Sequence, residues 1–232
     1  MMKRKPIVSA SIMYADPLYL GDEITALQKA GVEWLHVDVM DGHFVPNIVN
    51  GCPSLISGIK PHAKDMVIDT HLMIAQPERY FEAFIEAGAD ILVFHCEATE
   101  KPREAIKKIK ALGAKAGIAL NPKTPIYQIK HLLNELDMIL LMTVPPGFAG
   151  QTFDSSVLPK IESLAKMVGD RPIHIQVDGG LTLDNIELCA QNGANVFVAG
   201  TSSIFTKDSA PADSRVKPDA SHIIEEIHNL KI

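Results

Sequence analysis

The sequence predicts an α/β protein in which a single-domain (β/α)8 barrel, the TIM-barrel fold, occupies residues 1–232. Two observations lead to this prediction. Eight short apolar runs alternate with amphipathic stretches, and the chain averages about 29 residues per alternation, the size of a βα unit. No stretch of linker composition divides the chain into two domains. An open, doubly wound parallel sheet is the rival architecture.

The expected strands are nearly continuous apolar runs, which suits parallel strands that are covered on both faces. They are Ile7–Met13, Trp34–Val39, Met66–Met73, Ile91–His95, Lys115–Leu120, Met138–Val144, Ile173–Val177 and Val196–Ala199. Each expected strand is followed by a helical pattern, so the order of elements indicates an α/β protein rather than α+β.

The clearest expected helices are amphipathic, and several begin with a proline in the first turn and end near a glycine. They are Leu18–Ala30, Pro77–Ala87, Pro102–Leu112, Pro125–Leu136 and, at the C-terminal end, Ser221–Leu230. The segment Thr206–Ala220 is rich in Ser, Asp, Pro and Ala and is too polar to pack, so it predicts a surface loop.

The composition is that of a globular protein, with 47% hydrophobic and 22% charged residues and a net charge of -6. This is too apolar for a disordered chain. No long acidic or basic block is present, so we expect no nucleic-acid partner. No apolar run approaches the roughly 18 residues that span a bilayer, so we expect no membrane partner either.

Cysteine usage and the N-terminal segment predict a cytoplasmic location. Cys52, Cys96 and Cys189 cannot all pair with one another, and their spacing matches neither CxxC nor a zinc-knuckle pattern. The basic start of the chain leads into an apolar run that is too short for a secretory signal. A reducing compartment fits both observations.

Chemically active side chains lie where three of the expected strands end: His36 and Asp38, then His71, then Asp178. Ligands bind at the carboxyl ends of strands in both candidate architectures. His36 and Asp38 are two residues apart and therefore face the same side of their strand. Taken singly, each histidine is more often an ordinary core residue. Together, two His and two Asp predict a site for Zn²⁺, Fe²⁺, Co²⁺ or Mn²⁺.

Glycines follow the last three expected strands, in Gly147–Gly150, Gly179–Gly180 and Gly200. Glycine allows close approach to the backbone, so convergent N–H groups at three neighbouring strand ends predict a phosphate site. A single glycine would indicate only a tight βα turn. Three methionines also lie near strand ends with the same facing, and by spacing alone methionines are typical of core packing. They are Met40, Met73 and Met142.

The run HVDVMDGHFVPN over residues 36–47 closely resembles the ribulose-phosphate 3-epimerase family. The resemblance covers essentially the whole chain in order, and the twelve-residue run is highly specific. Its other matching segments are Ser11-Ile12, His71-Leu72-Met73, Asn121-Pro122, Pro146-Gly147-Phe148, Val177-Asp178-Gly179-Gly180 and Ala199-Gly200. The resemblance implies a (β/α)8 barrel that binds one divalent metal ion and a ketose phosphate.

Residue by residue, the resemblance implies four metal ligands, which are His36, Asp38, His71 and Asp178. Asp38 and Asp178 would also be the catalytic acid–base pair. Ser11, His71 and Asp178 would contact the sugar, and Met40, Met73 and Met142 would form an apolar collar around it. The phosphate end of the substrate would lie against Gly147, Phe148, Ala149, Gly150, Gly179, Gly180, Gly200 and Thr201.

The reaction implied by the resemblance interconverts D-ribulose 5-phosphate and D-xylulose 5-phosphate. Inversion at C3 removes a proton α to a carbonyl and returns a proton on the opposite face. One carboxylate on each side of C3 can do this, each acting alternately as base and acid. The cation would polarise the ketone and stabilise the enediolate.

Several positions depart from the usual family pattern without touching an expected ligand. Ala10 stands where Pro is usual, the loop after the sixth expected strand carries Pro145 and Ala149, and Thr143 and Thr201 stand where Ser is more usual. These residues are more similar to the allulose-6-phosphate 3-epimerase branch. The same chemistry on D-allulose 6-phosphate, giving D-fructose 6-phosphate, is therefore the alternative function.

Two other classes of function fit the residues less well. Related phosphate-binding barrels that act as decarboxylases or lyases carry Asp-x-Lys-x-x-Asp at the second strand, whereas Val39 and Met40 stand here with no lysine nearby. A non-catalytic sugar-phosphate sensor would not need both acid–base carboxylates. Members of the family are often dimers or hexamers, so we expect a homo-oligomer without choosing between them.

Overall fold

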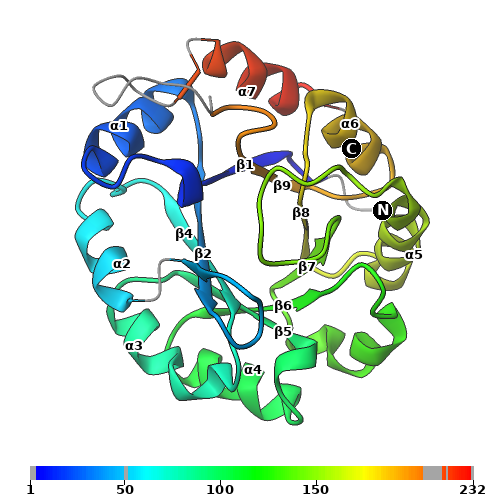
Figure 1. Cartoon of the computed structure of the whole chain (residues 1–232). Helices are drawn as coiled ribbons and strands as arrows, with labels where there is room; N and C mark the ends of the chain where they lie inside the picture. The colour runs from blue at the N-terminus through cyan, green and yellow to red at the C-terminus, as the bar shows by residue number, and fades with distance from the viewer. Residues whose placement is uncertain (1–3, 50–51, 206–215, 218, 231–232) are drawn as a thin grey trace.

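The computed structural model describes residues 4–49, 52–205, 216–217 and 219–230. In this part of the chain, eight parallel strands follow the order β1-β9-β8-β7-β6-β5-β4-β2, and a pairing between β1 and β2 closes the ring (Figure 1). The strands are β1 Ile7–Ser11, β2 Trp34–Asp41, β4 Val67–Met73, β5 Ile91–His95, β6 Lys115–Leu120, β7 Met138–Met142, β8 His174–Asp178 and β9 Val196–Ala199. Closure confirms the predicted TIM barrel and excludes the open sheet.

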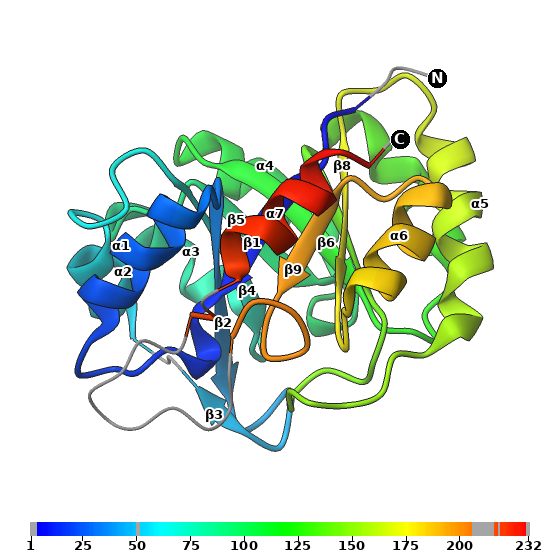
Figure 2. The same cartoon turned by 90° about the horizontal axis from the view of Figure 1, so that it is seen from above.

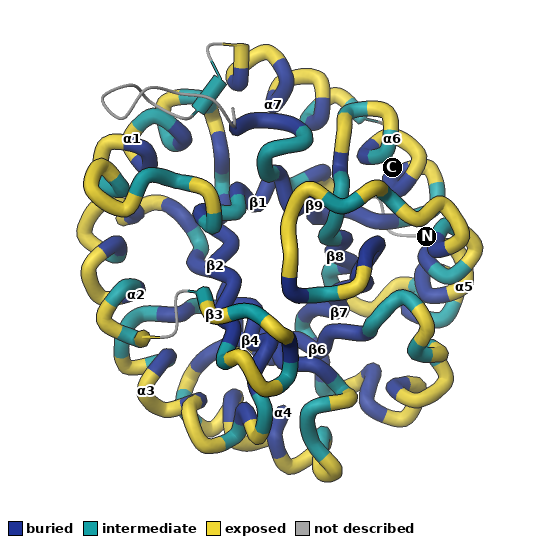
Figure 3. Tube along the Cα trace, viewed as in Figure 1, coloured by how far each residue is buried: buried dark blue, intermediate teal, exposed yellow. Residues whose placement is uncertain are grey.

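Helices surround the strands and bury one face each against them, as the alternation of buried and exposed residues in Figure 3 shows. They are α1 Leu20–Ala30, α2 Pro53–Ile59, α3 Phe81–Glu86, α4 Pro102–Ala111, α5 Leu158–Val168, α6 Leu183–Gln191 and α7 Ala220–His228. Proline occupies the first turn of α2, α4 and α5, where its missing N–H costs nothing. This face-by-face burial forms the layer between the strands and the helices.

Two of the predicted helices have a different local structure. Pro77–Ala87 is a 3-10 turn, η2 (Pro77–Arg79), followed by α3, and the residue before the turn, Gln76, has a left-handed backbone. Pro125–Leu136 is a 3-10 element, η4 (Ile126–Glu135), rather than an α-helix. Its buried residues Ile129 and Leu132 are three apart, a spacing that suits the three-residue turn of a 3-10 helix.

Two of the predicted strands end two residues earlier than expected. The first ends at Ser11, whose side chain caps the 3-10 turn η1 (Ile12–Tyr14). The sixth ends at Met142, and both the backbone N–H and the hydroxyl of Thr143 donate to the Asp178 carbonyl at 2.8 Å. Two further 3-10 turns are η3 (Cys96–Ala98) and η5 (Ser155–Val157).

The loop predicted over Thr206–Ala220 lies mostly outside the described residues, which resume at 216–217 and 219. Val216 forms an antiparallel bridge with Phe205, and the Lys217 N–H donates to the Ile204 carbonyl at 2.8 Å. The last predicted helix is present as α7, which begins one residue before the expected start.

The inside of the barrel is divided between an apolar and a polar part. Buried apolar side chains, among them Trp34, Val93, Leu140 and Val196, fill one part. Fully buried polar side chains from five strands fill the other: Ser9, His36, Asp69, His71, His95 and Gln176. Burying so many polar groups is costly unless they serve each other or a ligand, so the polar part marks the candidate site.

Two features lie at the carboxyl end of the barrel. The short strand β3 (Ile48–Val49) pairs antiparallel with the end of β2, and it lies on the same side of the molecule as the loop between β7 and α5 (Figure 2). None of the helices in the described residues is long and apolar enough to cross a bilayer.

Candidate active site

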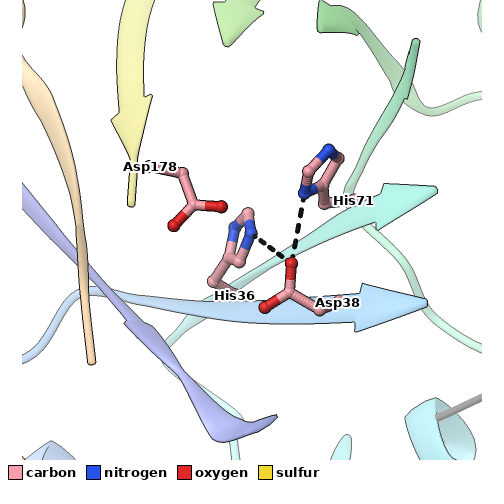
Figure 4. Close-up of side chains that lie close together, drawn as sticks. All are labelled: His36, Asp38, His71 and Asp178. Atoms are coloured by element: carbon pink, nitrogen blue, oxygen red, sulfur yellow. Dashed lines mark hydrogen bonds and ion pairs between the residues drawn. The ribbon is translucent and has the colours of Figure 1, made fainter. Parts of the chain in front are cut away.

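Four of the predicted residues meet at the carboxyl ends of β2, β4 and β8 (Figure 4). His36, Asp38, His71 and Asp178 each offer one ligand atom, and these atoms lie within 4.8 Å of one another. His36 and His71 are fully buried and Asp38 is only 5% exposed. The structure therefore contains a His₂Asp₂ cluster that could hold a metal ion.

The register of β2 and β4 places the cluster. His36 pairs with Asp69 and Asp38 pairs with His71, so that alternate residues of two neighbouring strands face the barrel interior together. The His36 ring lies between two carboxylates, with Nδ1 2.8 Å from Asp69 Oδ2 and Nε2 3.2 Å from Asp38 Oδ1. The Ser11 hydroxyl donates to the other oxygen of Asp38 at 2.9 Å.

The His71 ring uses its two nitrogens in opposite directions. Its Nδ1 lies 3.1 Å from Asp38 Oδ1, within the cluster, and its Nε2 lies 2.9 Å from His95 Nε2, outside it. Each histidine of the cluster thus turns one ring nitrogen toward the centre and the other toward a buried partner. This is the arrangement in which a second contact fixes the orientation of a metal-binding imidazole.

Charges inside the cluster separate the pKa values of its members. Burial lowers the pKa of His36, but the Asp38 and Asp69 carboxylates outweigh burial and raise the pKa well above its usual value. Burial lowers the pKa of His71 to about 4. Burial raises the pKa of Asp38, yet the His36 charge and the imidazole hydrogen bonds outweigh it and hold the pKa far below the usual range.

The pKa of Asp178 is shifted in the opposite direction from that of Asp38. Burial, followed by the charge of Asp38, raises the pKa of Asp178 to about 7. Two carboxylates in one buried site repel each other, and a divalent cation between them would remove that repulsion. Two imidazole nitrogens and two carboxylate oxygens are also the ligand types that Zn²⁺, Fe²⁺, Co²⁺ and Mn²⁺ accept. The residues present fit a divalent metal ion.

A pocket opens above the cluster and contains nearly all of the predicted substrate-binding residues. Its lining includes Ser11, Asp38, Met40, Met73, Met142, Gly147, Phe148, Ala149, Gly150, Asp178, Gly179, Gly180, Gly200 and Thr201. His71 is the exception, since it is fully buried beneath the pocket and does not line it. The three methionines are also buried and supply apolar wall without hydrogen-bonding groups.

Backbone geometry explains the two glycines that directly follow β8. Gly180 has a φ of 62°, and a Cβ atom there would lie 2.7 Å from the Gln151 carbonyl oxygen and 2.8 Å from the Phe153 nitrogen. A Cβ atom at Gly179, whose φ is 123°, would lie 2.5 Å from a methyl group of Val144. Only glycine lets these loops approach so closely.

The loop between β2 and β3 is tied to the rest of the pocket by two side chains. Asp41 accepts hydrogen bonds from the backbone N–H groups of His43, Phe44 and Ala75. The Asn47 amide donates to the Gly147 carbonyl at 2.8 Å, which joins this loop to the loop after β7. By accepting from the N–H groups two and three residues later, Asp41 stabilises the turn that follows β2.

Sequence reasoning assigned no role to a second set of buried polar residues. Asp69 accepts from Gln176 and faces His36, and both Asp69 and Gln176 are fully buried. His95 contacts His71 and places its Nδ1 3.3 Å from Glu97 Oε2. Asp69 and Gln176 each stand two residues before a cluster member on the same strand, and that spacing is the signal that could have found them.

Comparison with known proteins identifies the family. The model of the ribulose-phosphate 3 epimerase family matches residues 7–205, which is most of the chain. The chain belongs to the ribulose-phosphate 3-epimerase family. Ribulose-phosphate 3-epimerase of Bacillus subtilis is 45% identical over 213 residues, covering 90% of this chain and 97% of the relative. The chloroplastic ribulose-5-phosphate-3-epimerase of Arabidopsis thaliana is 44% identical, covering 91% of this chain and 76% of the relative.

Solved structures with a similar fold have much more distant sequences. The 3-keto-L-gulonate-6-phosphate decarboxylase of Vibrio cholerae superposes with a TM-score of 0.70 at 14% identity, covering 99% of this chain and 100% of that chain. Orotidine 5'-phosphate decarboxylase of Pyrococcus horikoshii gives a TM-score of 0.67 at 13% identity, covering 96% and 100%. These structures support the barrel alone. Membership in the ribulose-phosphate 3-epimerase family makes the chain an enzyme of the isomerase class.

Proposed function

We propose that this enzyme interconverts D-ribulose 5-phosphate and D-xylulose 5-phosphate by inverting the configuration at C3. The observation that carries the proposal is the pair of carboxylates, Asp38 on β2 and Asp178 on β8, which line one pocket and belong to one cluster of side chains (Figure 4). Inversion needs a proton acceptor on one face of C3 and a proton donor on the other. The names of the family relatives agree with this reaction.

Before a cation binds, the two carboxylates have different pKa values, because that of Asp38 is lowered and that of Asp178 is raised to about 7. A divalent cation held between them would favour the ionised form of both groups. In each turnover one ionised carboxylate would accept the C3 proton, and the other, having taken up a proton, would return it on the opposite face. In the reverse reaction the two roles exchange. The Ser11 hydroxyl, 2.9 Å from Asp38 Oδ2, orients the first carboxylate.

His36, Asp38, His71 and Asp178 would hold one divalent metal ion, and Zn²⁺, Fe²⁺, Co²⁺ and Mn²⁺ all suit this donor set. Such an ion supplies a Lewis acid that polarises the substrate ketone and stabilises the enediolate charge. Asp69, 2.8 Å from His36 Nδ1, positions the His36 ring for that role.

The rest of the pocket would hold the substrate away from water. Met40, Met73 and Met142 offer no hydrogen bonds, so the reacting carbon would lie against an apolar wall. Gly179, Gly180 and Gly200 leave room for the backbone to approach a phosphate group. Binding by these loops would fix C3 between the two carboxylates, and such positioning contributes to the rate.

The experiment that tests the proposal measures kcat/KM on D-ribulose 5-phosphate and on D-allulose 6-phosphate with one preparation whose metal content is assayed. We expect a preference for the pentulose, because the ribulose-phosphate names of the relatives favour it over the hexulose alternative. A preference for the hexulose would make Pro145 and Ala149 the basis of specificity and overturn the substrate assignment. Turnover of neither sugar by a metal-loaded sample would overturn the proposed function.

A further inference from the structure

A chain of three side chains leads away from the metal cluster and ends at the rim of the barrel. His71 contacts His95 through their Nε2 atoms at 2.9 Å, and His95 Nδ1 lies 3.3 Å from Glu97 Oε2. His71 and His95 are fully buried, while the Glu97 side chain is 24% exposed. The proposed acid–base chemistry makes no use of His95 or Glu97.

In the metal-loaded protein, an ionised Glu97 fixes the direction of the hydrogen bonds between His71, His95 and Glu97. A carboxylate accepts hydrogen bonds and donates none, so the facing nitrogen of His95, Nδ1, must carry a proton. The other nitrogen of a neutral His95 then has a free lone pair, which accepts the Nε2–H of His71. Nδ1 is the His71 nitrogen that faces the cluster in Figure 4, 3.1 Å from Asp38 Oδ1. Without a metal ion Nδ1 can donate to Asp38, whereas in the metal-loaded protein this arrangement would leave its lone pair free for the ion.

The surroundings of Glu97 keep it ionised and fix its orientation. The Asn121 backbone N–H donates to Glu97 Oε1 at 2.9 Å, and the Thr124 hydroxyl donates to the same oxygen. Burial raises the pKa of Glu97, but the hydrogen bonds from His95, Thr124 and Asn121 outweigh burial and lower the pKa to about 2. With Oε1 held by two donors, Oε2 is the oxygen that faces His95.

We propose that Glu97 and His95 are positioning residues that select the tautomer of His71 in which Nδ1 can bind the metal ion. The proposal rests on the assignment of His71 as a metal ligand. The Phe44 ring packs on His95 at 4.8 Å between ring centroids, which helps to hold the middle member of the chain in place. The corresponding contact on the other histidine ligand is simpler, because Asp69 receives the Nδ1–H of His36 directly.

Glu97→Gln should reverse the direction of the hydrogen bonds between Glu97, His95 and His71 with little change in side-chain shape. Asn121 N–H and Thr124 still need an acceptor, so the amide oxygen of the variant takes the place of Oε1 and its NH₂ group faces His95 Nδ1. His95 must then carry its proton on Nε2, where it opposes the Nε2–H of a metal-bound His71. Thr124→Val is the matched control, since it removes one hydrogen bond to Glu97 but leaves the charge and the polarity of the chain intact.

The test measures the equilibrium Zn²⁺ affinity of the full-length protein by competition with a chelator, together with the ring ¹⁵N signals of the zinc-loaded protein. We expect Glu97→Gln to weaken Zn²⁺ binding about 10–100-fold, and Thr124→Val to change it less than about threefold. In the parent protein we expect His95 to be protonated on Nδ1 and His71 on Nε2. In Glu97→Gln the Nδ1 proton of His95 should be lost.

Two results would each overturn the inference: His95 protonated on Nε2 in the parent protein, or unchanged Zn²⁺ affinity in Glu97→Gln. These measurements do not depend on turnover. If both agree with expectation while the zinc-loaded protein epimerises neither sugar, the proposed function fails and the positioning role stands. If the protein turns over ribulose 5-phosphate but Glu97→Gln binds Zn²⁺ normally, the positioning role fails alone.

Discussion

The two ends of the pocket are built from different parts of the chain. At the metal end, side chains of β2, β4 and β8 carry the chemistry, and each is oriented by another buried side chain, as Asp69 orients His36. At the other end, the loops after β7, β8 and β9 contribute mainly glycine backbone, and Gly180 leaves no room for a Cβ atom. One end therefore depends on charge and proton position, and the other on the path of the backbone.

The largest expected effect comes from removing the charge of one carboxylate at the metal end. Asp178→Asn keeps the shape but cannot transfer a proton, so kcat should fall about 10²–10⁴-fold or more. Asp184→Asn, on the exposed first turn of α6, is the control and should change kcat little. Steady-state kinetics with ribulose 5-phosphate provide the measurement. A kcat for Asp178→Asn within threefold of the parent would contradict the role of Asp178.

At the backbone end, alanine substitutions of Gly180 and Gly200 should have different consequences. Gly180→Ala places a Cβ atom against the Gln151 carbonyl at a positive φ, so we expect a loss of about 1–3 kcal/mol in the free energy of unfolding and a higher KM. A Cβ atom at Gly200 meets nothing within 4 Å, so that variant should lose less than about 0.5 kcal/mol.

Because Gly200 lines the pocket, Gly200→Ala should still raise KM by narrowing the space for the phosphate. Urea unfolding combined with steady-state kinetics separates the two effects. Gly58→Ala, in α2 with open space around its Cβ, controls for the substitution itself. Equal stability of the Gly180 and Gly200 variants would contradict the contrast between them.

Low pH should lower the stability of the folded protein through Glu97, which is linked to the metal end of the pocket by His95 and His71. The pKa of Glu97 is lowered from 4.5 to about 2, so this group stabilises the fold above pH 4.5, and the stabilisation is lost as the pH falls from 4.5 toward 2. The difference in unfolding free energy between the parent and Glu97→Gln should shrink by about 1 kcal/mol between pH 6 and pH 3.5, after allowance for solvent screening. Urea titrations at both pH values measure it, and a difference that grows with acid would contradict the shift.

The smallest expected effect concerns the contact that links the two loops over the pocket. Asn47→Ala removes the hydrogen bond from the Asn47 amide to the Gly147 carbonyl, a neutral contact worth about 0.5–1.5 kcal/mol. We expect KM to rise up to about tenfold while kcat changes less. Ile48→Ala, at an exposed neighbouring side chain, is the control. A larger change in kcat than in KM would show that Asn47 acts on the chemistry instead.

The residues of the metal end could be predicted because they stand where three of the expected strands end. His36 and Asp38 are two apart on one strand, and His71 and Asp178 end two others. The resemblance then implied that all four are metal ligands. Their buried partners could not be predicted in the same way, since the contact of His95 with His71 depends on how β4 and β5 pair and on which nitrogen each ring presents. The sequence also could not show that the Thr143 hydroxyl would donate to the Asp178 carbonyl.

At the backbone end, the sequence located the glycines but not the reason for each. Gly180 is required by contact with the backbone of Gln151 and Phe153, whereas Gly200 has open space where a side chain would be. That difference depends on the path of a loop that begins about thirty residues earlier in the chain, so local patterns could not reveal it. The 3-10 form of η4 could not be predicted either, because apolar residues three apart suit an α-helix as well as a 3-10 helix.

The pairing of Ser11 with His36 between β1 and β2 closes the ring of backbone hydrogen bonds around the barrel. In a closed barrel, no strand can shift along its neighbours without breaking the backbone hydrogen bonds on both of its edges. A slip of one residue in β2 would turn His36 and Asp38 toward the outer layer and destroy the cluster. Insertions or deletions within β2 should therefore be far more damaging than changes in the loops above it.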